Sequence, residues 1–149
     1  MFVDDVRISG MASSVEDFEA GALTSDFTTG GTWPWGIDTV AASGTYGVRS
    51  AAIIHSQSSW LRYTVTNDRS AQLGYAARTQ TETNDALVVS VDGIEVNRIS
   101  GDQAWWYWVH PLSPGTHTIE WRFQRDASGS ALANAVWIDD VFVVLDECP

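Results

Sequence analysis

Two adjacent carboxylates interrupt an apolar stretch near the end of the chain. Residues 135–144 (AVWIDDVFVV) are rich in β-branched and aromatic side chains, which is typical of a β-strand. Successive side chains of a strand point to opposite faces, so either Asp139 or Asp140 points into apolar surroundings. A buried carboxylate is costly unless it is hydrogen-bonded, ion-paired or bound to a metal. The pair is therefore a candidate site for one of these interactions.

The first residues of the chain repeat this pattern. Residues 2–8 (FVDDVRI) match residues 137–143 (WIDDVFV) in the order aromatic, β-branched, Asp, Asp, Val, any residue, β-branched. In the N-terminal copy, most apolar side chains share a face with the first aspartate, Asp4. By analogy, we expect Asp139 to point inward on the face of Val141 and Val143, and Asp140 to point outward.

Aromatic residues form a second group with binding chemistry. Residues 33–35 (WPW) predict a rigid knot whose indole rings either cap the core or stack on a sugar. In a strand, residues 105–108 (WWYW) place two aromatic side chains on each face. If the strand is half-buried, only one of these two pairs can lie in its own core. The apolar face of a pyranose suits such rings, while its hydroxyls need polar partners. The candidate ligand-binding residues are Trp33, Trp35, Trp60, Trp105, Trp106, Tyr107 and Trp108.

No catalytic signature is found, and we predict that the protein is not an enzyme. The histidines, His55, His110 and His117, lack the spacing of metal ligands. The sequence has neither a Gly-x-Ser-x-Gly elbow nor a glycine-rich phosphate loop. Its one cysteine, Cys148, builds no internal disulfide; it either is left over from a longer chain or serves as an intermolecular thiol.

The length and charge of the chain narrow the choice of partners. A chain of 149 residues forms one domain with a sizeable core. The net charge is −11 and all eight basic residues are arginines, which argues against nucleic acid or an anionic membrane as a partner. No apolar run could span a membrane, and no signal peptide is evident, so an export signal would be removed or lie upstream in a longer chain. The composition fits an extracellular or cell-surface protein, although negative charge also simply keeps a domain soluble.

About ten strands and no helical periodicity are expected. Residues 22–45 are predicted to be rich in loops. Asp92-Gly93 between two β-branched runs predicts a type I′ hairpin. Strands of this spacing predict an all-β fold, a two-sheet antiparallel jelly-roll β-sandwich. The predicted strands cover residues 2–8, 15–21, 46–54, 58–65, 71–78, 86–91, 94–99, 105–109, 116–123 and 135–144.

Five segments, taken in order, resemble the repeated jelly-roll modules of large bacterial surface and secreted proteins. They are residues 17–19 (DFE), 34–38 (PWGID), 46–50 (YGVRS), 114–121 (PGTHTIEW) and 137–141 (WIDDV). Such modules are similar to MAM and cleaved-adhesin domains and, more loosely, to carbohydrate-binding modules.

The resemblance implies a metal site. Many such modules hold a structural Ca²⁺ between an acidic pair on the first strand and an aspartate on the last. Carried over to this sequence, Asp17 or Glu19 and Asp139 or Asp140 would supply oxygens, with carbonyls and water completing the shell. The alternative is that backbone N–H groups or an arginine satisfy these carboxylates.

We predict a jelly-roll module over residues 15–145, a tail over 146–149, and an extra strand with a linker over 1–14. The extra strand is the end of a preceding repeat, an addition to its own sheet, or a strand inserted into a neighbouring subunit. The predicted function is a non-catalytic extracellular adhesion or carbohydrate-binding module, stabilised by structural calcium, with a glycan or cell-surface ligand. The alternative is a structural subunit of an extracellular filament or surface array, assembled through residues 2–8.

Overall fold

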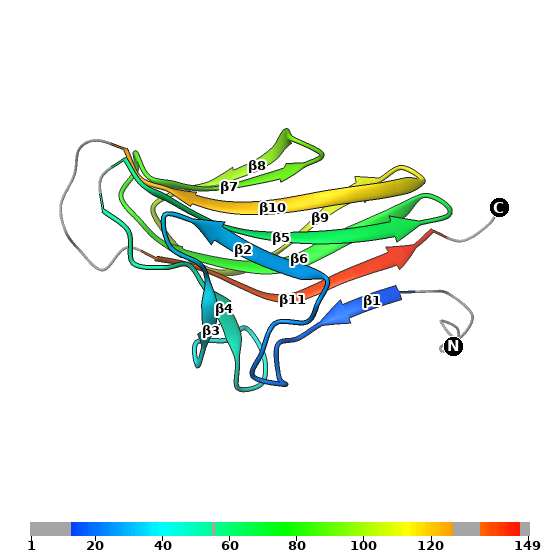
Figure 1. The fold of residues 1–149 in the computed structure, drawn as a ribbon, viewed down its shortest axis with the longest axis horizontal. Helices are drawn as coiled ribbons and strands as arrows, with labels where there is room; N and C mark the ends of the chain where they lie inside the picture. Colours follow the sequence, from blue (N-terminus) through cyan, green and yellow to red (C-terminus); the bar gives the residue numbers. More distant parts are fainter. Residues whose placement is uncertain (1–12, 55, 127–134, 147–149) are drawn as a thin grey trace.

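The protein folds into two antiparallel β-sheets that enclose a common core (Figure 1). The computed structural model describes residues 13–54, 56–126 and 135–146. The first sheet has the strand order β3-β4-β11-β6-β9, with β1 also paired to β11, and the second has the order β2-β5-β10-β7-β8. The predicted two-sheet all-β sandwich is confirmed. The strands are β1 (Ser13–Glu16), β2 (Phe27–Gly31), β3 (Gly36–Asp38), β4 (Gly47–Arg49), β5 (Ser58–Asn67), β6 (Ala71–Gln80), β7 (Ala86–Val91), β8 (Ile94–Ile99), β9 (Asp102–Leu112), β10 (Gly115–Gln124) and β11 (Ala135–Leu145).

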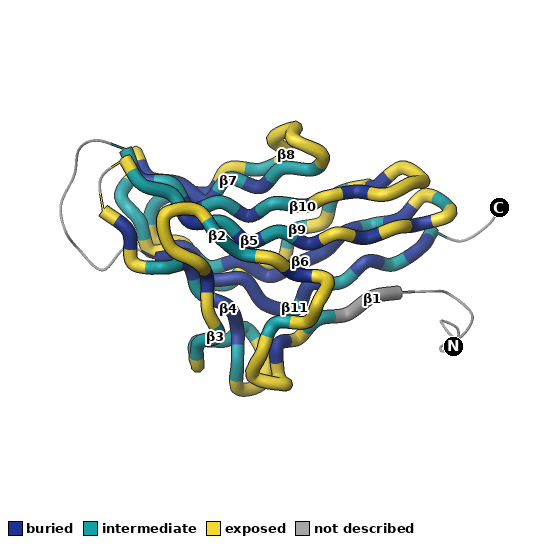
Figure 2. Tube along the Cα trace, in the orientation of Figure 1, coloured by how far each residue is buried: buried dark blue, intermediate teal, exposed yellow. Residues whose placement is uncertain are grey.

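Alternate side chains of the long strands fill the core. In β10, Ile119, Trp121 and Phe123 are fully buried, and His117 is also buried. Thr118, which lies between His117 and Ile119, is exposed, as the alternation in the sequence predicts. Figure 2 shows the same banding along β5, with exposed residues in the turns, at the β7–β8 tip and along the edge strands β8 and β9. Among the described residues, the structure contains no helix that is long and apolar enough to cross a membrane.

The Asp92-Gly93 hairpin is confirmed. These two residues join β7 to β8 with φ angles of 53° and 84°, and a type I′ turn needs positive φ at both positions. The Asp92 carboxylate also accepts hydrogen bonds from the N–H of Thr118 at 2.9 Å and from His117 Nδ1 at 2.6 Å. The turn is thereby tied to β10.

Several strand boundaries differ from the prediction. Residues 22–45 contain two strands, β2 and β3, which add to the outer edges of the two sheets. The strand predicted to reach residue 21 ends at Glu16, because Phe18 has a left-handed φ of 60° that no strand continues. The strand predicted over 46–54 is limited to β4, since the chain then crosses to the second sheet and begins β5.

The predicted terminal features lie mostly outside the described residues. Residues 2–8 and Cys148 are not described, so the interpretations of the N-terminal copy and of the thiol stay predictions. The described sandwich begins with β1 at Ser13 and ends with β11 at Leu145.

Candidate functional site: an aromatic groove at the sheet edge

β9 is the last strand of its sheet, which leaves its aromatic run open on one side. Trp106 and Trp108 pair with Ala77 and Tyr75, the core-side positions of β6, so they lie on the core side of β9. Tyr107 lies on the opposite side and is 55% exposed. Trp108 packs against the core, but Trp106 remains 67% exposed. The alternation predicted for this run is confirmed, and it leaves one large ring accessible on the inner side.

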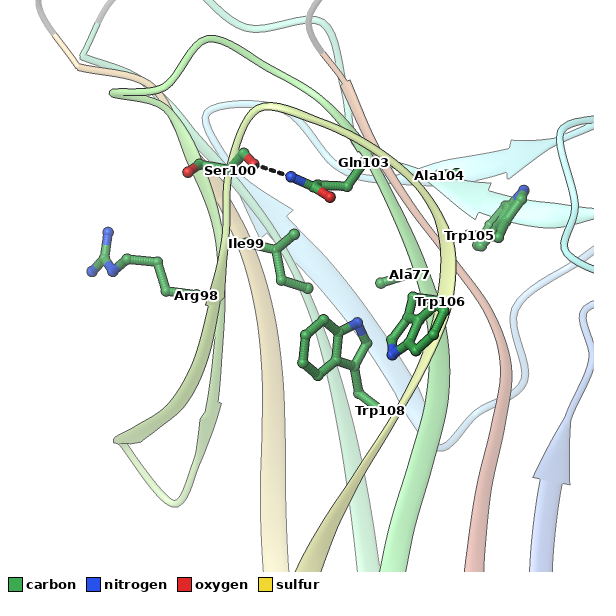
Figure 3. A pocket seen from close by; sticks show the side chains of 9 residues that line it. All are labelled: Ala77, Arg98, Ile99, Ser100, Gln103, Ala104, Trp105, Trp106 and Trp108. Atoms are coloured by element: carbon green, nitrogen blue, oxygen red, sulfur yellow. Dashed lines mark hydrogen bonds between the residues drawn. The ribbon is translucent and has the colours of Figure 1, made fainter.

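The open side of β9 and the edge of the second sheet border a groove. The groove has a volume of about 540 Å³ and combines aromatic, amide, hydroxyl and guanidinium groups. Figure 3 shows the rings of Trp106 and Trp108 side by side, with Gln103 and Ser100 nearby and Trp105 on the other side of the β9 ribbon. The lining, which we call the edge groove, consists of Ala77, Arg98, Ile99, Ser100, Gln103, Ala104, Trp105, Trp106 and Trp108.

A hydrogen-bonded network ties the two sheets together near the groove. The hydroxyl of the fully buried Tyr75 on β6 bonds to Asn97 Nδ2 on β8 at 3.2 Å and to His110 Nε2 on β9 at 2.9 Å. Burial raises the pKa of Tyr75 and lowers the pKa of His110, so both side chains are neutral near pH 7. The network links both strands that border the groove.

A β-bulge interrupts β9 beside Trp105. Trp106 pairs with Ala77 and Gln103 pairs with Thr79, so Ala104 and Trp105 both face the single residue Arg78 on β6. Trp105 lies on the other side of β9 from Trp106, as the alternation predicts, and also lines the groove. The bulge is visible only once the two strands are paired, and the sequence prediction did not include it.

The other candidate tryptophans lie away from the edge groove. Trp33 is 58% exposed in the β2–β3 connection. Trp35 is only 3% exposed and belongs to the core, so its interpretation as an exposed sugar platform is wrong and its alternative role of capping the core applies. Trp60 lies on β5 beneath the guanidinium of Arg62, which is 3.8 Å from its ring centroid.

The aspartate pair lies where β11 changes partners. On the edge away from β6, Trp137 and Ile138 pair with β4, whereas residues 141–144 pair with β1. Asp139 pairs with Ala76 and Phe142 with Gly74, so the ladder contains an extra residue at the aspartates. Asp140 has a φ of 50°, the left-handed conformation that this bulge requires.

The bulge inverts the alternation of β11. Val136 and Ile138 face the core before it, and Val141, Val143 and Leu145 face the core after it. The prediction that Asp139 shares a face with Val141 and Val143 is therefore wrong. Asp139 lies on the outer side of the sheet, yet it is fully buried.

The 41–46 loop covers Asp139. Asp139 Oδ2 accepts hydrogen bonds from the N–H groups of Ala42 at 2.9 Å and Ser43 at 3.2 Å, and Oδ1 accepts one from Asp140 N at 2.7 Å. Burial raises the pKa of Asp139 to about 6, against these three hydrogen bonds. The loop is thus attached to the last strand through one carboxylate.

Two further carboxylates contact the same loop. Glu19 accepts hydrogen bonds from Thr45 N at 2.7 Å and Tyr46 N at 2.8 Å, next to Gly44, where a Cβ would collide with the carboxylate. Asp140 accepts bonds from Ser43 Oγ at 2.9 Å and from Tyr107 Oη at 3.3 Å. Neither contact could be read from sequence spacing.

In this structure the predicted calcium ligands accept hydrogen bonds from protein donors, which is the alternative that the sequence left open. Among the described residues, no group of three or more His, Cys, Asp or Glu side chains could hold a metal ion. Oxygens of Glu19 and Asp139 already face N–H donors, whereas Ca²⁺ needs six to eight oxygens directed at itself. Asp17 accepts a bond from Glu19 N at 3.1 Å. Calcium at Asp17, Glu19, Asp139 and Asp140 stays a prediction.

Sequence reasoning missed a stacked cluster on the outer side of the first sheet. The ring of Trp137 lies between two guanidinium groups, those of Arg49 at 5.7 Å and Arg78 at 5.0 Å. Its Nε1 donates to Asp38 Oδ2 at 2.9 Å. These residues come from four strands, and only the register of β11 with β4 and β6 brings them together.

The lining of the edge groove determines which chemistry it offers. Its described residues include aromatic rings, an amide and a hydroxyl, but no carboxylate or imidazole. Such a lining can stack on an apolar ring face and hydrogen-bond to hydroxyls.

Comparisons with known proteins identify the fold. No family model matches the chain, and no curated protein matches it. A cleaved adhesin domain of Lys-gingipain from Porphyromonas gingivalis is similar in structure with a TM-score of 0.70 at 12% identity, covering 91% of this chain and 99% of that one. The CBM22-1 xylan-binding domain of Xyn10C from Paenibacillus barcinonensis has a TM-score of 0.64 at 16% identity, covering 91% and 95%. TmCBM61, solved with β-1,4-galactotriose, has a TM-score of 0.59 at 18% identity, covering 87% and 94%.

These similarities extend over most of each chain, at identities that establish the fold alone. The chain is a jelly-roll β-sandwich of the kind found in cleaved adhesin domains and carbohydrate-binding modules.

Proposed function

We propose that this protein is a non-catalytic, extracellular glycan-binding module whose ligand lies in the edge groove. The observation that carries the proposal is the exposure of Trp106, which is 67% accessible beside the half-buried Trp108. An indole of this kind can stack on a sugar ring, and the nearby Ser100 and Gln103 can bond to sugar hydroxyls. The volume of about 540 Å³ is in the range of small-ligand pockets.

The structural neighbours support this assignment. One is a xylan-binding domain and another was solved with β-1,4-galactotriose. The extracellular location of this protein is proposed by analogy with the cleaved adhesin domains. These proteins suggest the probes with which to start, xylan and β-1,4-galactan.

The proposal is tested by affinity electrophoresis in gels containing each polysaccharide, with tryptophan fluorescence as a second readout. We expect the wild-type protein to be retarded by at least one polysaccharide and Trp106→Ala to migrate as in a gel without polysaccharide. Trp33→Ala is the matched control, since Trp33 is 58% exposed on another part of the surface. Absence of retardation across a broad polysaccharide panel contradicts the proposal, and loss of binding in Trp33→Ala alone moves the site to the β2–β3 connection.

Two earlier expectations stay predictions. Structural calcium and assembly through residues 2–8 gain no support from the described residues, and the N-terminal copy lies outside them.

A further inference from the structure

Among the described residues, Arg78 differs from the other arginines because it has no ionic partner there. The described part of the chain contains seven arginines, and six of them have a carboxylate within 4.0 Å. Arg78 has no such partner among these residues. In a protein with a net charge of −11, an unpaired guanidinium is notable because carboxylates are abundant.

Arg78 lies on the outer side of the first sheet, in a hollow that adjoins the edge groove across β9. It faces the bulge formed by Ala104 and Trp105, and these three residues line a second hollow together with Asp102 and Gln103. This hollow, of about 460 Å³, shares Gln103, Ala104 and Trp105 with the edge groove. A chain-like ligand that stacks on Trp106 reaches the guanidinium by crossing the open edge of β9 at these three shared residues.

The Trp137 ring supports the guanidinium of Arg78. The guanidinium carbon lies 5.0 Å from the ring centroid, a cation–π contact that restricts the side chain. A guanidinium held in this way is preorganised for a planar anion, because its parallel N–H groups match the two oxygens of a carboxylate. Arg98, which lines the edge groove, is less suitable since its Nε and Nη2 atoms already donate to Glu95 at 3.1 and 2.9 Å.

We propose that the Arg78 hollow is a subsite for a carboxylate-bearing sugar, a uronic acid unit of an acidic polysaccharide. The assignment rests on the proposed glycan-binding function and specifies its ligand class. Asp102 is the opposing charge in the hollow, and it limits the preference for anions. The neighbouring polar groups, Gln103 and the β9 backbone, are available to the sugar hydroxyls.

The test compares acidic polysaccharides with their uncharged counterparts. Glucuronoxylan, polygalacturonate and alginate are each used beside a carboxyl-reduced sample, in which the carboxylate becomes a hydroxymethyl group and the ring is otherwise unchanged. At low ionic strength, we expect the wild-type protein to bind at least one acidic form about tenfold more tightly than its reduced form, which corresponds to ~1.4 kcal/mol. Arg78→Gln should bind both forms equally, and Asp102→Asn should increase the preference for the acidic form.

The controls separate this inference from the proposed function. Arg69→Gln, the same change at a turn between β5 and β6, should keep the wild-type preference. Two outcomes refute the acidic subsite and leave the glycan-binding function standing. In the first, Trp106→Ala abolishes binding but wild type binds the acidic and reduced forms equally. In the second, Arg78→Gln keeps the wild-type preference for the acidic form. If no polysaccharide binds in either form, both proposals fail. Dextran sulfate tests for nonspecific attraction to polyanions. If wild type and Trp106→Ala both bind dextran sulfate as tightly as wild type binds the acidic polysaccharide, the preference for the acidic form is nonspecific and the subsite is refuted.

Discussion

The carboxylate of Asp139 accepts a hydrogen bond from the backbone N–H of Ala42 at 2.9 Å, across 97 positions of the sequence. This bond joins the bulge of the last strand to the loop between β3 and β4. It explains how a carboxylate tolerates full burial on the outer side of a sheet.

Replacing Asp139 with Ala should destabilise the protein by ~2–4 kcal/mol, because three N–H groups lose their acceptor. Urea unfolding at pH 7 measures the change. Asp26→Ala removes the same charge from an exposed position and should change stability by less than about 0.5 kcal/mol. Equal stability of the two variants would contradict the role of Asp139 in holding the 41–46 loop.

Calcium should have little effect on stability if N–H groups satisfy the carboxylates. We expect the melting temperature in EDTA to match that in millimolar CaCl₂, since Glu19 and Asp139 already bond to loop amides. Differential scanning calorimetry measures this comparison, with MgCl₂ as the ionic control. A calcium-specific rise of several degrees that disappears in Asp139→Ala would instead establish the metal site inferred from the resemblance.

His117 should make stability depend on pH. Its Nδ1 faces Asp92 Oδ2 and its Nε2 faces the carbonyl of Ser113, both at 2.6 Å, so both nitrogens donate only in the protonated ring. The hydrogen bond to Asp92 raises the pKa of His117 above its ordinary value of 6.5. This contribution to stability is fully present below pH 6.5 and is lost as the pH rises through the folded-state pKa.

Unfolding experiments between pH 5.5 and 9 check the His117 prediction. Wild type should lose stability over this range relative to His117→Gln, whose side chain does not titrate. Identical pH profiles for the two proteins would contradict it, and NMR titration of the imidazole would give the folded-state pKa independently.

Tyr75→Phe should weaken both stability and glycan binding. The hydroxyl of Tyr75 bridges β8 and β9, and its removal leaves Asn97 Nδ2 and His110 Nε2 without this partner, at a cost of ~1–3 kcal/mol. Because these strands border the edge groove, we expect reduced retardation in polysaccharide gels. Tyr46→Phe, a change outside the network, is the control, and unchanged stability with unchanged binding in Tyr75→Phe would show that the bridge is dispensable.

Local patterns in the sequence determined much of the fold. The alternation of residues 116–123 predicted which side chains of β10 enter the core, because a strand repeats every two residues. Asp92-Gly93 predicted its turn because few residues adopt positive φ at low cost. The same reasoning placed Trp106 and Trp108 on one side of β9.

Tertiary structure decided the features that depend on partners distant in the chain. The bulge at Asp139 and Asp140 exists because the ladder with β6 holds one extra residue, and this reversed the predicted face of Asp139 relative to Val141. Exposure of Trp106 and burial of Trp35 followed from which strand ends a sheet and which loop covers the core. The position of Arg78 opposite the β9 bulge likewise required the register of two strands. Periodicity is a local property of the chain, whereas register, edge position and loop cover are set by contacts between segments far apart in sequence.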